Sequence, residues 1–166
     1  MIVEERGIEY EIDKENHYAK VIGCFDDIED VFIPRFIKHD SQEYPVKILS
    51  TKAFYCKSIR TVNFPEDSEV QTIKIDIFGT LTNITKFYLP TNVIELEEGW
   101  CMNTRKRLTI TVSPKNKRFT TYKNDLVIGK SDPQSDNFDT LYFVSREIKQ
   151  LEIPSFIKKI NSYAIS

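Results

Sequence analysis

The sequence predicts a right-handed repeat solenoid that is mainly β, with a parallel sheet along one side and short helical or 3-10 turns along the other. Its 166 residues include 11 Phe and 8 Tyr, and together with many Ile and Val these favour strands. A short apolar motif that ends in proline recurs along the chain, and a second motif precedes it in the same order. Because we find no linker and no low-complexity segment, we expect one domain.

The proline-terminated motif predicts the strands of the sheet. Its form is apolar-x-x-apolar-x-apolar-Pro at 28–34, 59–65, 84–90 and 148–154, with a weaker copy at 108–114. The last two apolar positions face the same side of a strand, and the proline ends the strand because it has no N–H for the next ladder bond. We expect one continuous parallel sheet of five strands in sequence order, ending near Ile33, Phe64, Leu89, Val112 and Ile153.

The second motif predicts the return path of each coil. Apolar residues and an Ala-Phe pair occupy 46–54, and related segments lie at 70–78, 93–101 and 157–165. We interpret this motif as a bend and a short turn. Only five glycines are present, so many turns should form without positive φ. A single coil cannot bury its apolar edge, but stacked coils bury it between them.

Hairpins are predicted at two places outside the repeats. Residues 8–12 alternate, 13–16 turn and 18–22 return, which predicts a cap over 1–27. The solenoid should then fill 28–166, interrupted at about 115–146 by a β-hairpin insertion with strands near 125–128 and 140–145.

These motifs resemble those of the BspA-like leucine-rich repeat proteins. Ala53-Phe54-Tyr55-Cys56 matches the family's Ala-Phe-x-Cys segment, and 59–65 matches its strand. The resemblance covers about 28–165 and is weakest at Trp100-Cys101, which lacks the Ala-Phe pair. It implies a horseshoe-like solenoid, protein interaction or adhesion, and no catalytic residues.

Nothing in the motifs indicates catalysis, a cofactor or a metal, so we expect a protein that is not an enzyme. His17 and His39 have no Cys or acid at ligand spacing. The formal net charge of −2 argues against nucleic-acid binding. We interpret the basic residues as a solvated face: Arg105, Lys106, Arg107, Lys115, Lys117 and Arg118.

The three cysteines and the first residues of the chain suggest a cellular setting. Cys24, Cys56 and Cys101 are odd in number and widely spaced, which argues against a disulfide framework. We expect Cys56 to be a small apolar plug between coils.

Residues 1–10 lack the apolar core of a secretory signal, so a cytoplasmic location is expected, or the cell surface if the chain is a fragment. No apolar run is long enough for a membrane span. The sequon Asn83-Ile84-Thr85 would carry sugar only on a secretory route.

The sheet's outer face is the expected binding surface. If Val31 and Ile33 point inward, the residue between them points outward, and exposed aromatic residues on a rigid sheet are typical interface anchors. We therefore predict a module that binds a protein of unknown identity. Its predicted contact residues are Phe32, Asn63, Tyr88, Thr111 and Glu152.

An alternative function is structural, through end-to-end self-association. The segment 157–165 resembles the opening half of a further coil, and nothing predicted caps it. The predicted contact residues of this end are Ile153, Ile157, Ile160 and Ile165.

Overall fold

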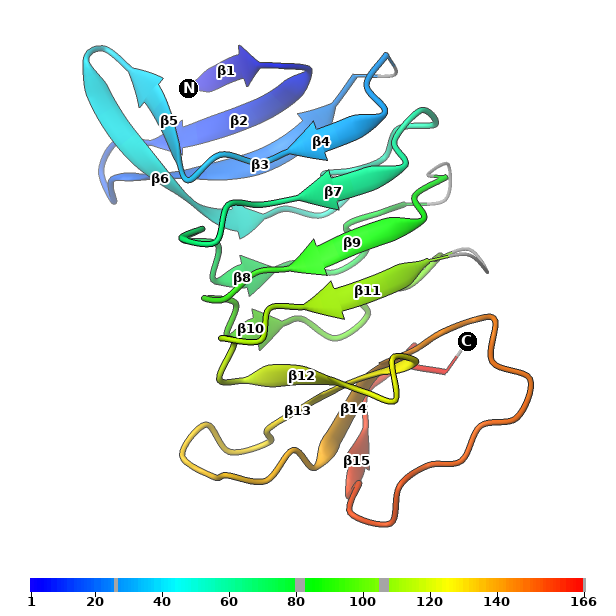
Figure 1. The fold of residues 1–166 in the computed structure, drawn as a ribbon. Helices are drawn as coiled ribbons and strands as arrows, with labels where there is room; N and C mark the ends of the chain where they lie inside the picture. The colour runs from blue at the N-terminus through cyan, green and yellow to red at the C-terminus, as the bar shows by residue number, and fades with distance from the viewer. Residues whose placement is uncertain (26, 80–82, 105–107, 166) are drawn as a thin grey trace.

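The computed structural model describes residues 1–25, 27–79, 83–104 and 108–165, which form a β-solenoid (Figure 1). The strands are β1 (Ile2–Glu5), β2 (Ile8–Asp13), β3 (Tyr18–Cys24), β4 (Asp30–Phe32), β5 (Phe36–His39), β6 (Gln42–Leu49), β7 (Thr61–Asn63), β8 (Thr72–Ile73), β9 (Lys86–Leu89), β10 (Glu95–Leu96), β11 (Thr109–Val112), β12 (Phe119–Tyr122), β13 (Leu126–Gly129), β14 (Thr140–Val144) and β15 (Lys159–Ile160).

Four of the five predicted repeat strands form one parallel sheet, in the order β4-β7-β9-β11. We call it the front sheet. Val31 pairs with Val62, Val62 with Phe87, and Phe87 with Ile110, so each repeat contributes its apolar residue at the same level. All four side chains are buried. The in-register stacking confirms the predicted solenoid.

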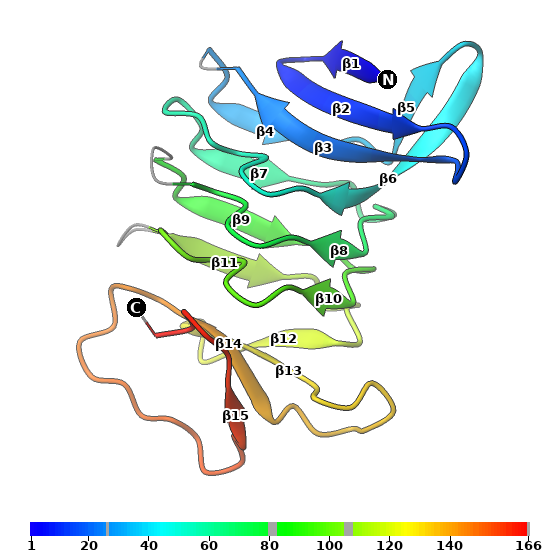
Figure 2. The ribbon, with the colours of Figure 1, turned by 180° about the vertical axis from the view of Figure 1, so that it is seen from behind.

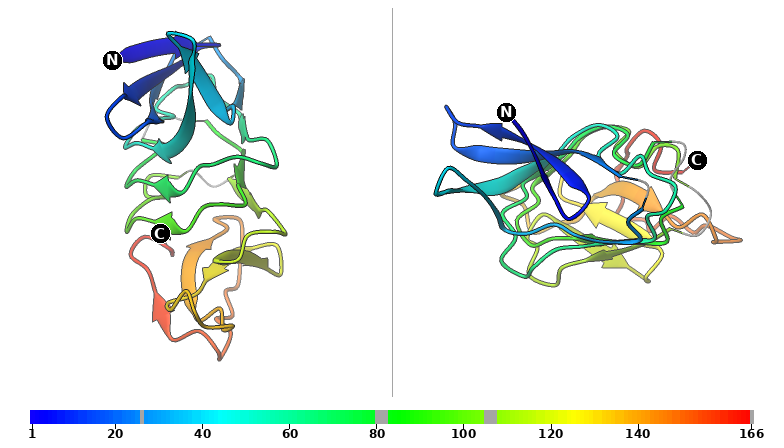
Figure 3. Two further views of the ribbon diagram at one scale, coloured as in Figure 1. Left: turned by 90° about the vertical axis from the view of Figure 1, so that its left-hand side faces the viewer. Right: turned by 90° about the horizontal axis from the view of Figure 1, so that it is seen from above.

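A second parallel row lies behind the front sheet, where β3, β6, β8 and β10 pair in that order (Figure 2). Each turn of the solenoid joins one back strand to one front strand: β3 to β4, β6 to β7, β8 to β9 and β10 to β11. Seen from above, the turns lie over one another (Figure 3). The second strand of the N-terminal hairpin is therefore also the first strand of the back row, and β5 forms a hairpin with β6.

The expected helical turns are wrong, because the described residues contain no helix. The backbone of the second motif makes hydrogen bonds from coil to coil as well as within short turns. The Phe54 N–H donates to the Ile77 carbonyl at 2.9 Å, and the Ile77 N–H donates to the Trp100 carbonyl at 3.3 Å. Because amides such as those of Phe54 and Ile77 are used between coils, the local bonds of this segment do not continue into a helix.

A left-handed residue recurs just before these positions in three successive coils and again in the C-terminal segment. Lys52, Asp76, Gly99 and Tyr163 have φ of 58°, 52°, 78° and 64°. Only one of the four is glycine, so positive φ is more common here than the few glycines suggested. After Lys52, Asp76 and Gly99 the next two side chains are buried, whereas after Tyr163 only that of Ala164 is buried.

Aromatic rings connect successive coils in the interior. The Phe87 ring lies 5.4 Å from that of Phe78, 5.9 Å from that of Phe64 and 6.4 Å from that of Trp100. These side chains are buried, and Phe78 and Phe64 meet Phe87 edge to face. Such contacts bind neighbouring coils into one core.

The insertion differs from the repeats. Strands β12, β13 and β14 pair antiparallel, as the predicted hairpin requires, and β15 pairs parallel with β14. The predicted fifth front strand near Ile153 is wrong, because 148–158 contains no strand. Ile148, Leu151 and Ile157 instead pack against a second apolar cluster around Leu126 and Leu141. The insertion therefore offers these apolar residues a different place for burial.

The expectation that the cysteines form no disulfide is also wrong. Cys24 and Cys56 are bonded, with their Cα atoms 6.3 Å apart. Cys24 ends β3, and Cys56 follows the Ala53-Phe54 pair in the next coil. Stacking the first two coils brings together two residues that are 32 positions apart in sequence.

Candidate protein-binding surface

The outer face of the front sheet carries two columns of side chains. The ladder places Phe32 beside Asn63 and Tyr88 beside Thr111. Phe32 is 49% exposed, Asn63 and Thr111 are exposed, and Tyr88 is half-buried against the core. Folding thus aligns four of the five predicted contact residues on one face.

The second column is polar and partly paired. The register aligns Asp30 with Thr61, Thr61 with Lys86, and Lys86 with Thr109. The Thr61 hydroxyl donates to a carboxylate oxygen of Asp30 at 2.6 Å. The outer face therefore combines an exposed ring with a row of hydrogen-bonding groups on a rigid ladder.

Glu152 is separate from this surface. It is exposed, but it lies in the segment 148–158, which forms no strand. Its expected position in the outer column is therefore wrong, since that position depended on a fifth strand.

The C-terminal end presents apolar residues. Ile153, Ile160 and Ile165 are exposed, as are Phe156 and Tyr163. Ile157 is half-buried against the second apolar cluster, and the Phe156 ring meets that of Tyr122 edge to face at 5.5 Å. We call the five exposed residues the end patch.

The basic cluster is only partly described. Lys115 forms an ion pair with Glu66, while Lys117 is exposed and Arg118 is half-buried. Arg105, Lys106 and Arg107 lie outside the described residues. Asn83 of the sequon donates its side-chain amide to the Lys57 carbonyl at 2.9 Å.

The free cysteine and the two histidines, which are the remaining candidates for catalysis or metal binding, make structural contacts. Cys101 is a buried free thiol, and burial raises its pKa to about 12, which suppresses the reactive thiolate. The His17 ring packs 4.9 Å from that of Tyr44, and His39 lies 3.0 Å from Asp40. Within the part of the chain that the structure describes, no group of three or more His, Cys, Asp or Glu residues could hold a metal ion.

Within the described residues, no helix is long and apolar enough to cross a bilayer.

Three solved structures are similar to this chain at low identity. A leucine-rich cell surface protein from Faecalibacterium prausnitzii is 13% identical, with 95% of this chain and 65% of that one covered and a TM-score of 0.38. A leucine-rich repeat protein from Bacteroides ovatus is 14% identical, with 67% and 40% covered and a TM-score of 0.31. The pneumococcal vaccine antigen PcpA is 13% identical, with 99% and 61% covered and a TM-score of 0.34. The chain thus spans less than two thirds of the length of these proteins.

No protein of curated function matches the sequence. A family model does: the BspA type leucine rich repeat region, in six copies, matches residues 36–125. The match includes the motifs from 46–54 to 108–114 but not the copy at 28–34, and it confirms the resemblance seen in the sequence. The chain therefore belongs to the family of BspA-type leucine-rich repeat proteins.

Proposed function

We propose that the protein is a non-catalytic binding module whose partner surface is the outer face of the front sheet. Family membership supports an interaction or adhesion role. The observation that carries the site is the exposed Phe32 ring, held on a ladder in line with Asn63, Tyr88 and Thr111. Exposed aromatic side chains on a rigid support lose little entropy on binding and dominate many interfaces.

Replacement of both aromatic residues tests this surface. A Phe32→Ser/Tyr88→Ser protein should capture less of its partner from the source cell, and its affinity for the partner once identified should fall by about 2 kcal/mol or more. Ile94→Ser is the matched control, because Ile94 is 61% exposed but lies outside the front sheet. Equal affinities of the double variant and the wild type in a titration would reject the outer face.

We also propose that the module works at the cell surface. The Cys24–Cys56 disulfide supports this setting, because such bonds persist in oxidising compartments and are rare in the cytosol. Fractionation of the source cell, followed by thiol counting on the native protein, tests the location. A protein recovered from the cytosol with three reduced thiols would contradict it.

End-to-end assembly is a second candidate function, supported by the end patch. Ile160 is 46% exposed on a strand that pairs with β14 on one side only. Ile160→Lys should then shift the sedimentation of concentrated protein toward monomer, while Ile94→Lys should not. Monomeric wild-type protein at all concentrations would exclude this function.

A further inference from the structure

A pocket of about 440 Å³ lies beside the insertion, where two neighbouring turns of the solenoid meet the loop between β13 and β14. Its apolar lining comes from Val93 and Ile94 in the turn after Pro90 and from Pro133 in the loop. Val93 is buried, whereas Ile94 is 61% exposed. A pocket of this size with an apolar lining is typical of sites for small organic ligands.

The polar wall of the pocket is a turn that is fixed by hydrogen bonds. The Asn116 side-chain oxygen accepts from the Arg118 N–H at 2.8 Å, and its amide donates to the Val93 carbonyl at 3.1 Å. The Lys130 N–H, where the loop begins, donates to the Arg118 carbonyl at 3.1 Å. Because these bonds join the walls to one another, less entropy is lost when a ligand binds.

The charged lining of the pocket is basic. Lys115, Lys117 and Arg118 line it, and no acid of the described residues does. Lys115 forms an ion pair with Glu66. Within the described residues, Lys117 and Arg118 form neither an ion pair nor a side-chain hydrogen bond. We call this space the basic pocket.

The Arg118 guanidinium is half-buried, and its Nε atom is enclosed without a hydrogen-bond acceptor. A buried donor without an acceptor destabilises a folded chain, so such a group is rare. Outside the described residues the chain has one further acidic side chain, Asp26. Its neighbour Phe25 donates to the Gly7 carbonyl in the N-terminal hairpin, at the other end of the solenoid from the insertion (Figure 1). An anion in the basic pocket would balance the guanidinium charge.

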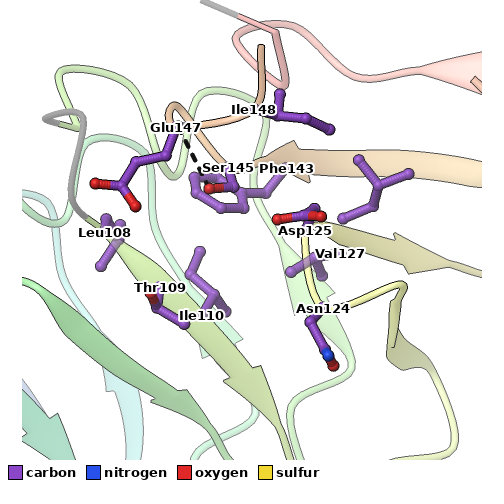
Figure 4. Close-up of a pocket in the computed structure, with 11 residues that line it drawn as sticks. Leu108, Thr109, Ile110, Asn124, Asp125, Val127, Phe143, Ser145, Glu147 and Ile148 are labelled. Atoms are coloured by element: carbon purple, nitrogen blue, oxygen red, sulfur yellow. Dashed lines mark hydrogen bonds between the residues drawn. The ribbon is translucent and has the colours of Figure 1, made fainter. Parts of the chain in front are cut away.

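A second cavity in this region has a lining of opposite charge. It measures about 330 Å³ and lies between β11 and the insertion. Figure 4 shows the side chains of Asp125 and Glu147, which line it, on either side of Ser145. An anionic ligand is repelled by these carboxylates and attracted by Lys117 and Arg118. Charge complementarity therefore favours the basic pocket for an anion.

We propose that the basic pocket binds a small organic carboxylate with an apolar body. The planar guanidinium of Arg118 donates to the carboxylate, for which its fork of N–H groups is well matched, and Lys117 adds a second positive charge. Ile94 and Pro133 contact the apolar body. This site is separate from the outer face of the front sheet and from the end patch, so it does not depend on either proposed function.

A direct test is amide NMR titration of the isotope-labelled whole protein with phenylacetate. The resonances of Val93, Ile94 and Arg118 should shift and saturate. Phenylacetamide keeps the ring but lacks the charge, and acetate keeps the charge but lacks the ring. Each should bind at least about tenfold more weakly than phenylacetate, because each loses one of the two contacts.

Variants of the basic pocket separate its charge from its apolar lining. Arg118→Gln should weaken phenylacetate binding at least about tenfold, and Arg118→Lys about threefold, because lysine keeps the charge but not the fork. Ile94→Ser should weaken binding of phenylacetate but not of acetate. Lys149→Gln removes an exposed lysine elsewhere and should have no effect.

Two further measurements exclude indirect effects. Arg118→Gln without ligand should keep the urea midpoint of wild type, because the guanidinium has no hydrogen-bond partner to lose within the described residues. Phe32→Ser/Tyr88→Ser should bind phenylacetate as wild type does, which distinguishes this site from the outer face.

Three results would overturn the proposal. The first is the absence of saturable shifts at millimolar phenylacetate. The second is equal affinity of phenylacetate for wild type and Arg118→Gln. The third is a set of shifts centred on Asp125 and Glu147, which would place the ligand in the other cavity.

Discussion

The sulfur of Cys24 at the end of β3 is bonded to that of Cys56, which lies in the turn after Ala53-Phe54. The bond joins the N-terminal hairpin to the second coil of the solenoid. It closes a loop that contains β4, β5 and β6, so it restricts the unfolded chain over the whole first turn.

Loss of this disulfide should destabilise the protein. For a sequence separation of 32 residues, the loop-entropy model gives a cost of about 3–4 kcal/mol. Urea unfolding of Cys24→Ala/Cys56→Ala against wild type measures this cost. Reductant should lower the stability of wild type but not that of the double variant. Thiol titration of the unfolded, unreduced wild type should find one free thiol, from Cys101, and a count of three would contradict the bond.

The Phe87 ring should be among the most costly side chains to truncate. It contacts the rings of Phe54, Phe64, Phe78 and Trp100, so Phe87→Ala leaves a cavity between coils. We expect the free energy of unfolding to fall by about 3–5 kcal/mol, with Phe64→Ala in the same range. Phe87→Leu should cost less because it retains most of the volume. A loss below about 1 kcal/mol for either alanine variant would show that the ring is not part of the core.

Asn116 should be essential to the junction between β11 and β12. Its side-chain amide donates to the carbonyls of Pro90 and Val93 at 2.8 and 3.1 Å, and its oxygen accepts from the N–H groups of Arg118 and Phe119, each at 2.8 Å. Because the side chain is buried, Asn116→Ala should lower the free energy of unfolding by on the order of 3 kcal/mol.

Asn92 is the matched control, because it occupies the equivalent position after Pro90 and donates one bond, to the Ser68 carbonyl at 2.7 Å. Asn92→Ala should cost about 1 kcal/mol in the same unfolding assay. Equal losses for the two variants would argue against a special role for Asn116.

Lys52 adopts a left-handed conformation at φ 58°, which an L-residue with a side chain tolerates poorly. Lys52→Gly should therefore raise the unfolding free energy by about 0.5–1 kcal/mol, in spite of the greater entropy of the unfolded chain. Lys47→Gly, within β6, should be destabilising instead. A destabilised Lys52→Gly protein would contradict this account of the turn.

Asp139 should make the stability depend on pH. The backbone N–H of Ser131 donates to its carboxylate at 2.9 Å and the Ser131 hydroxyl donates at 2.8 Å, and these bonds lower the pKa of Asp139. A depressed folded-state pKa gives stability that is present above about pH 4 and is lost as the pH falls through the folded value. The difference in urea midpoint between wild type and Asp139→Asn should therefore be larger at neutral pH than at acid pH. A constant difference would show that ionisation of Asp139 is not involved.

The repeat pattern was sufficient to predict the solenoid, because the residues that stack in neighbouring coils are neighbours in a short motif. Val31, Val62, Phe87 and Ile110 occupy the same place in their copies, and strand alternation decides which side they face. The outward direction of Phe32 followed from the same alternation.

Other features depended on contacts between segments far apart in the chain. Nothing in the spacing of Cys24 and Cys56 indicates that two stacked coils bring them together. The pattern at 148–154 matched a strand, but Ile148 and Leu151 instead pack, partly buried, against the apolar cluster of the insertion. The cavity lined by Ile110, Asp125 and Glu147 was equally invisible, because residues far apart in the chain line it together. A local motif determines which face of a coil is apolar, whereas the tertiary structure decides which distant surface covers that face.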